Sequence, residues 1–331
     1  MFNRRLGRGG RGQRLTSWVT VTGTGSVGEA ATVDLPALLA DLGLPGLADI
    51  HVHFLPERVL RKVWAVFDNA ELHYGQPWPI TYRHGEHERL AVLRGLGVRR
   101  FTSLVYAHKP AMSAWLNDWS LEFAAGTPGC ASTATFFPEP TAVHYVADAL
   151  DRGARVFKLH LQVGDYDPRD PLLDPVWGLC EDADAVLVVH CGSGPLPGRF
   201  TGPGPIGEVL ARHPRLRLVV AHLGLPEYAH FVALAERYDQ VLLDTTMAGT
   251  DFVQQFAPFP TDLRPRIRDL ALAGKVVLGS DFPNIPYRYQ HQIAVLPRLG
   301  IDDANSLAQV LWHTGARLLG DGSPVEPVPP G

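Results

Sequence analysis

The sequence predicts an α/β protein, a single (β/α)8 TIM barrel. Short apolar runs with β-like composition alternate with segments in which apolar residues recur at helical spacing. Eight such pairs follow one another, and no linker-like stretch separates them. Alternating strands and helices are typical of a parallel sheet, and eight units match a closed barrel. An open doubly wound sheet is the alternative, but it gives no reason for eight units.

Composition narrows the class of protein. The chain has 331 residues, of which 46% are hydrophobic and 19% charged, so it can bury a large core. Its net charge of −4 indicates no nucleic-acid partner. Three cysteines argue against a disulfide framework and favour a reducing, cytoplasmic compartment. No apolar run approaches the roughly 20 residues of a membrane span, so no membrane association is expected.

Both ends of the chain are predicted to be disordered tails. Residues 1–30 begin with a basic, Gly-rich stretch, and no continuous apolar segment of a signal peptide follows it. Residues 321–331 are rich in proline. The barrel is therefore assigned to residues 31–320.

The predicted strands are apolar runs of five to eight residues. In chain order they are 47–54, 101–107, 131–137, 154–161, 185–191, 216–222, 241–245 and 276–281. The fifth is continuously apolar up to His190, as expected of a strand that is buried on both faces.

The predicted helices carry apolar residues at three- and four-residue spacing. They are 89–96, 111–125, 139–150, 175–182, 206–212, 228–237, 265–273 and 305–319. Asp174 is predicted to cap the fourth of these, and Gly320 to end the last. A further helix, 35–42, precedes the first strand and is expected to close the bottom of the barrel.

Several predicted strands end in a metal-binding or ionisable residue. His51 and His53 lie two apart and share one face of the first strand. The other strand-end residues are Lys158, His160, His190, His222 and Asp281. Each alone is also consistent with a structural role. Because strand ends meet at the catalytic face of a barrel, together they predict a divalent metal site, with zinc favoured by nitrogen and carboxylate donors.

Four motifs in this order resemble the amidohydrolase superfamily. They are Asp49-Ile50-His51-Val52-His53-Phe54, Val188-Val189-His190, Val220-Ala221-His222-Leu223-Gly224 and Gly279-Ser280-Asp281-Phe282-Pro283. More narrowly, the chain from about residue 48 to 319 is similar to the amidohydrolase-related family, which includes aminocarboxymuconate-semialdehyde decarboxylase, resorcylate decarboxylases and lactonases. It departs from that family in its long segment 1–46 and in Thr314-Gly315, where relatives usually show Asn-Ala.

The resemblance implies one divalent metal ion, held by His51, His53, His190 and Asp281. It also implies that Asp281 acts as general base on a metal-activated water, and that His222 helps to activate water or polarise the substrate. Asp49 precedes His51 by two residues, so we expect it on the same face, as an anchor one layer below the metal.

Lys158 leaves an alternative open. In some members of the superfamily a lysine on the fourth strand is carbamylated and bridges two metals. Lys158 and His160 share a face of the predicted strand, so a second metal or a substrate contact is conceivable there. One metal is the favoured reading.

The substrate pocket is predicted from loop residues that follow the strands, namely His108, Glu139 and Asn284. The long segment 68–83, with Trp78, is either a lid over the metal or a surface excursion.

The predicted function is hydrolysis of an amide, lactone or related C–N or C–O bond in a small molecule. The alternative is non-oxidative decarboxylation of an aromatic or unsaturated carboxylic acid, for which Arg58, Arg199 and Arg288 are candidate carboxylate clamps. A non-enzymatic barrel is disfavoured by the complete ligand set. Relatives are often dimers, so a homodimer is also expected.

Overall fold

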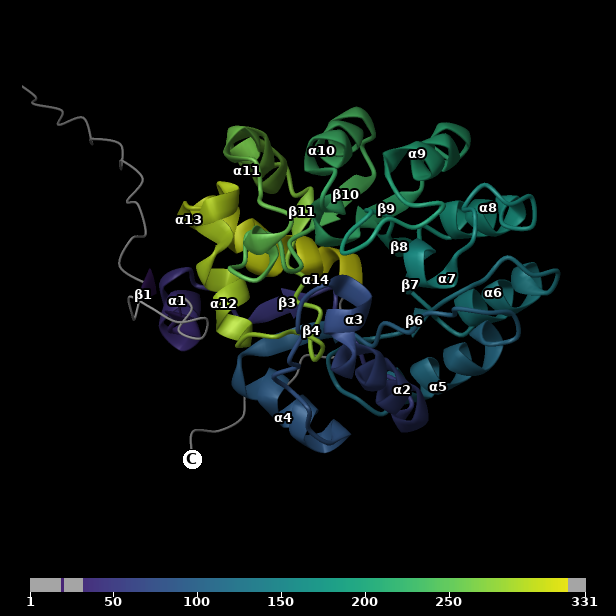
Figure 1. The fold of residues 1–331 in the computed structure, drawn as a ribbon, viewed down its shortest axis with the longest axis horizontal. Helices are drawn as coiled ribbons and strands as arrows, with labels where there is room; N and C mark the ends of the chain where they lie inside the picture. Colours follow the sequence, from purple (N-terminus) through teal and green to yellow (C-terminus); the bar gives the residue numbers. More distant parts are fainter. Residues whose placement is uncertain (1–18, 21–31, 321–331) are drawn as a thin grey trace, which may run out of the picture.

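The computed structural model describes residues 19–20 and 32–320. The rest of both predicted tails lies outside the described residues. In the predicted N-terminal tail, β1 (Val19–Thr20) pairs antiparallel with β2 (Thr32–Val33), which lies at the start of the range assigned to the barrel. Strand β2 contacts α12 (Tyr289–Ala294). Helix α1 (Leu35–Asp41) follows β2 and lies at the outer edge of the molecule (Figure 1).

Parallel strands form the predicted barrel (Figure 1). In chain order they are β3 (Leu47–Asp49), β4 (Val98–Thr102), β5 (Cys130–Ala131), β6 (Thr133–Ala134), β7 (Val156–His160), β8 (Val186–His190), β9 (Arg217–Val220), β10 (Val241–Asp244) and β11 (Val276–Val277). The third predicted strand is split into β5 and β6 at Ser132. Within each sheet every strand pairs with its neighbours in the chain, so the doubly wound alternative, which needs a change of strand order, is wrong.

The barrel closes where the last strand meets the first. The backbone N–H of Asp281 donates to the carbonyl of His51 at 2.8 Å, and that of His53 donates to Phe282 at 2.7 Å. Strands β9 and β11 are shorter than predicted and end at Val220 and Val277. Beyond them, His222 and Asp281 have positive φ angles of 58° and 68°, so neither residue continues the extended backbone. This closure brings the first and eighth predicted strand ends side by side.

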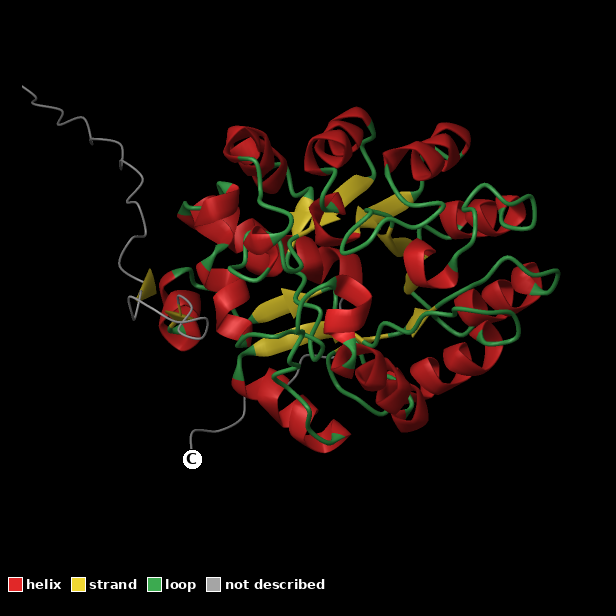
Figure 2. Ribbon diagram, in the orientation of Figure 1, coloured by secondary structure: helices red, strands yellow, loops and turns green. Residues whose placement is uncertain are grey.

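Helices surround the sheet (Figure 2). Those on the outer ring are α4 (Glu86–Gly95), α5 (Ser113–Ala125), α6 (Ala142–Asp151), α8 (Asp174–Asp182), α9 (Pro203–Arg212), α10 (Tyr228–Arg237) and α11 (Arg264–Leu272). Three further helices belong to the connections between strands: α2 (Glu57–Asp68), α3 (Ala70–Tyr74) and α7 (Leu161–Gly164). No helix in the described ranges is long and apolar enough to cross a membrane.

Three helix predictions need correction. The predicted helix 305–319 is α13 (Ala304–Ala308) and α14 (Thr314–Leu319), joined by a π-helical turn. Asp174 is the first residue of α8 and caps nothing, because its carboxylate contacts Arg212 and His213 instead. The bottom of the barrel is closed by α14, whose Leu318 and Leu319 join the apolar cluster inside it, and α1 takes no part in that cluster.

Candidate metal centre

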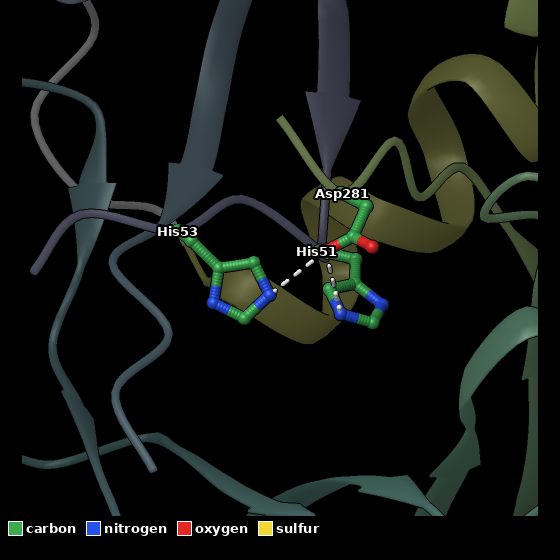
Figure 3. A group of neighbouring side chains, drawn as sticks. All are labelled: His51, His53 and Asp281. Atoms are coloured by element: carbon green, nitrogen blue, oxygen red, sulfur yellow. Dashed lines mark ion pairs between the residues drawn. The ribbon is translucent and has the colours of Figure 1, made fainter. Parts of the chain in front are cut away.

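Three of the predicted metal ligands meet at one point (Figure 3). The ligand atoms of His51, His53 and Asp281 all lie within 4.8 Å of one another. Asp281 Oδ1 is 3.0 Å from His53 Nε2 and 3.8 Å from His51 Nε2. The two histidines follow β3 and the aspartate follows β11, so barrel closure creates this cluster.

The outer nitrogens of both imidazoles are held by hydrogen bonds. His51 Nδ1 donates to Asp244 Oδ2 at 2.8 Å, and His53 Nδ1 donates to the carbonyl of Leu104 at 2.9 Å. A proton on Nδ1 leaves the lone pair on Nε2, which faces Asp281 in both residues. Such hydrogen bonds set the tautomer of metal-binding histidines.

Asp244 is the residue that the sequence analysis missed. Its Oδ1 accepts the backbone N–H groups of His222 at 2.8 Å and Thr246 at 3.0 Å, and its side chain is fully buried. Burial acts to raise the pKa of this carboxyl, but the charge and hydrogen bond of His51 outweigh it and hold the pKa below its usual range. The signal was present, because Asp244 ends the apolar run Val241-Leu242-Leu243 as other site residues end theirs.

The protonation states suit metal binding. Burial, followed by the nearby charge of Lys158, lowers the pKa of His51 to about 4. For Asp281, burial acts to raise the pKa, but its close contacts with His53 and His51 outweigh it, and the net shift is downward. Neutral imidazoles and an ionised carboxylate are the forms that ligate metals.

The site also contains an unsatisfied polar atom. His222 Nδ1 is buried, and it has no hydrogen-bond partner among the described residues. An unsatisfied buried group costs about 1–3 kcal/mol, so a ligand that engages it is stabilising. Together with the converging lone pairs of His51 and His53, this donor set fits a divalent metal and its substrate.

Lys158 adds a competing contact. Its side chain is 1% exposed, and Nζ lies 3.0 Å from His51 Nε2. Burial lowers the pKa of this amine to about 8, so most of it is protonated at neutral pH. The ammonium and a metal ion need the same lone pair of His51, so metal binding must break this hydrogen bond.

His190 and His160 lie beside the three-residue cluster. Their rings stack with centroids 4.0 Å apart, and His190 Nε2 donates to the carbonyl of Gly194 at 2.9 Å. Burial lowers the pKa of both imidazoles well below the usual value, so they are neutral. His190 is outside the group whose ligand atoms lie within 4.8 Å, and its role as fourth ligand stays a prediction.

Asp49 supports His51 differently from the expectation. Its Oδ1 accepts the backbone N–H of His51 at 3.0 Å, and its Oδ2 accepts the hydroxyl of Tyr289 at 2.8 Å. Ile50 belongs to the cluster inside the barrel, so strict alternation fails between Ile50 and His51. Asp49 therefore holds the backbone of His51, while Asp244 holds its ring. Burial raises the pKa of Asp49 to about 6.

A cavity of about 750 Å³ opens over these residues. His108 and Asn284 line it, as predicted. Glu139 does not; its Oε2 accepts the backbone N–H of Ala111. Trp78 of the long segment 68–83 also lines the cavity, and its indole N–H donates to the carbonyl of Asn284 at 2.8 Å.

The cavity has a wall that the sequence analysis did not predict. Helix α2 contributes residues at four-residue spacing: Arg58, Val59, Lys62, Val63, Val66 and Phe67. Of the three arginines proposed as carboxylate clamps, Arg58 lines the cavity, whereas Arg199 and Arg288 do not. Tyr106, which follows β4, also faces the cavity and packs edge-on against His53 with ring centroids 5.9 Å apart.

Comparison with known proteins decides the family, because residues 48–320 match the amidohydrolase family. The chain belongs to the amidohydrolase family. It is an enzyme of this family and acts on small-molecule substrates. No curated protein matches its sequence.

Solved structures of low sequence identity share the fold of this amidohydrolase. A TIM-barrel protein from Bordetella bronchiseptica is 18% identical, covering 82% of this chain and 98% of its own, with a TM-score of 0.66. IDCase from Metarhizium anisopliae is 15% identical, covering 84% and 98%, with a TM-score of 0.56. A probable 2-pyrone-4,6-dicarboxylic acid hydrolase from Acinetobacter baumannii is 12% identical, covering 83% and 99%, with a TM-score of 0.54.

Proposed function

We propose that this amidohydrolase is a metal-dependent hydrolase of an amide, lactone or related C–N or C–O bond. The observation that carries the proposal is the convergence of His51, His53 and Asp281 beneath the cavity. We assign His190 as the fourth ligand of a single ion. Nitrogen and carboxylate donors favour zinc.

When bound, zinc would supply the Lewis acidity that activates a water and polarises a substrate carbonyl. Asp281 lines the cavity and is ionised, so its carboxylate accepts the proton of the attacking water. The same group then returns this proton to the leaving nitrogen or oxygen.

His222 is proposed to stabilise the developing negative charge. It lines the cavity, and its backbone N–H is fixed by Asp244. Burial, followed by the charge of His51, lowers the pKa of its imidazole to about 4, so the ring is neutral and donates from one nitrogen only. A hydrogen bond from this ring to the substrate oxygen would strengthen as charge accumulates there.

One observation favours decarboxylation as a second candidate. Arg58 lines the cavity together with many apolar side chains, so a carboxylate paired with it would lie in a poorly hydrated environment. Removal of water from a carboxylate favours its loss as carbon dioxide.

The test is an activity panel of aryl amides, lactones and dihydroxybenzoate-like acids with the zinc-loaded enzyme. We expect hydrolysis of at least one ester or amide class, and a loss of about 10²–10⁴ in rate for Asp281→Asn if it is the general base. The control is Asp302→Asn, on the surface far from the cavity lining. A near-native rate for Asp281→Asn with its metal intact would reject the general base, and carbon dioxide release without hydrolysis would replace the proposal.

A further inference from the structure

Helix α2 presents two chemically different faces. Arg58 and Lys62 are one turn apart on the face that lines the cavity, and Val59 and Val63 lie beside them. On the other side, Arg61 pairs with Glu57 of the same helix and does not line the cavity. The cation that does not line the cavity is therefore paired, whereas the two that line it are exposed at its rim and have no acidic partner among the described residues.

The cationic end of the cavity has no counter-charge. Lys109, which follows β4, lines the cavity near Arg58 and Lys62, and Arg58 lies over the ring of Trp115 at 4.7 Å. In the part of the chain that the structure describes, no carboxylate within 4.0 Å pairs with any of these three cations, and Asp281 is the one carboxylate in the lining. Like charges one helical turn apart repel each other, so an anion between them would be stabilising.

The positive charge of this part of the cavity also affects His108. It lines the cavity beside Lys109. Burial, followed by the charges of Lys109 and Lys62, lowers the pKa of its imidazole. Lys109 and Lys62 thus act on one region of the cavity.

The other end of the cavity is aromatic. Phe67, Tyr74 and Trp78 line it, with Trp78 5.3 Å from Phe67 and 6.0 Å from Tyr74 between ring centroids. Two apolar side chains at this end remain unusually exposed, Val66 at 43% and Phe256 at 36%. Apolar surface that a protein leaves open beside a cavity commonly marks a binding site.

We propose that the cavity selects an amphipathic anion. Its carboxylate, or a similar anionic group remote from the reacting bond, lies among Arg58, Lys62 and Lys109. Its aromatic or other large apolar body lies against Phe67 and Trp78. The volume of about 750 Å³ suits such a molecule. That this ligand is the substrate rests on the proposed function. That the cavity binds such a molecule does not depend on the proposed function.

The experiment compares two fluorescent probes that differ in one group. The probes are 8-anilinonaphthalene-1-sulfonate and N-phenyl-1-naphthylamine, which share the aromatic body, and only the first carries the anion. Both are titrated into the full-length, zinc-loaded protein. We expect the wild type to bind the sulfonate more tightly than the neutral probe. In the double variant Arg58→Gln, Lys62→Gln, the affinity for the sulfonate should fall about tenfold, and the affinity for the neutral probe should not change.

Two further variants sharpen the test. Arg61→Gln removes a cation from the outer face of α2 and should leave both affinities unchanged. Trp78→Ala should weaken both probes, because they share the aromatic body. Circular dichroism and thermal unfolding verify that each variant is folded.

Equal binding of the two probes by the wild type, or equal weakening of both by the double variant, would overturn the inference. The readout is binding and not turnover, so the two proposals fail separately. Intact probe selectivity without any hydrolysis would reject the proposed function alone, and hydrolysis without selectivity would reject this inference alone.

Discussion

Replacement of Asp244 by asparagine should reverse the direction of the hydrogen bond that holds His51, so that His51 accepts where it now donates. At present Oδ1 accepts two backbone N–H groups and Oδ2 accepts His51 Nδ1 at 2.8 Å. In Asp244→Asn the amide oxygen can keep the backbone contacts, which leaves the NH₂ group facing His51. His51 must then accept at Nδ1 and carry its proton on Nε2. The lone pair directed at the metal site is lost.

The size of the effect follows from this change of tautomer. Loss of the group that orients a metal-binding histidine reduces metal affinity by about 10–100-fold. That corresponds to about 1.4–2.8 kcal/mol of binding free energy. The metal-free protein should also lose about 1 kcal/mol of unfolding free energy, because a neutral hydrogen bond replaces a charge-assisted one.

The assay is competition for zinc against a chromophoric chelator, combined with urea unfolding of the metal-free protein. Asp239→Asn is the matched control, since Asp239 is exposed just before β10. We expect the control to match the wild type and Asp244→Asn to bind zinc more weakly while unfolding cooperatively. Wild-type zinc affinity in Asp244→Asn would refute the argument that Asp244 sets the tautomer of His51.

Three other predictions concern the metal centre and the closed end of the barrel. Lys158→Met removes the amine that lies 3.0 Å from His51 Nε2, so zinc affinity should rise at one equivalent per chain. Two equivalents in the wild type, with one lost in the variant, would instead support the two-metal alternative. In the metal-free protein the pKa of His51 is lowered from 6.5 to about 4, so its stabilising contribution is complete above pH 6.5 and is lost as the pH falls towards 4. His222, His160 and His190 also have lowered pKa values, so the wild type and His51→Gln both lose stability over that range. Urea unfolding of His51→Gln should lose on the order of 3 kcal/mol less than the wild type, and equal slopes for both proteins would contradict the assignment. Gly315→Ala would place a Cβ atom 2.6 Å from the carbonyl oxygen of Ala48, so we expect a loss of about 1–3 kcal/mol in unfolding free energy. In the control Gly178→Ala, in α8, the new Cβ meets nothing within 4 Å, so the unfolding free energy should rise by up to about 1 kcal/mol. Equal changes in unfolding free energy for the two variants would be evidence against close contact between α14 and β3.

The barrel was predictable because its signals are local. Each strand is an apolar run of a few residues, and β8 with its end at His190 could be recognised without knowledge of any partner. The meeting of His51 and His53 with Asp281 then follows from closure of a parallel barrel, which places the first and last strands together.

The residues that hold His51 in place were harder to predict from the sequence, because their roles depend on distant partners and on local irregularity of the backbone. Asp244 is 193 residues from His51 in the chain, so no spacing rule connects them. Asp49 was placed beneath the metal on the assumption of strict alternation, and that assumption fails where Ile50 and His51 both turn inward.

Helix α2 was also missed. Its buried residue is Leu60, and its second apolar stripe faces the cavity together with cations. Its apolar residues nevertheless recur at helical spacing on one side, with charged residues on the other, so the signal for a helix over 57–68 was present in the sequence.

Anomalous X-ray scattering at the zinc edge, from crystals of the zinc-loaded enzyme, would test the metal centre most directly. We predict one strong peak per chain, at about 2.0–2.2 Å from His51 Nε2, His53 Nε2 and a carboxylate oxygen of Asp281. Displacement of the Lys158 amine from His51 should accompany it. A loaded crystal with no peak among these three residues, or with its peak elsewhere in the molecule, would contradict the proposed metal centre.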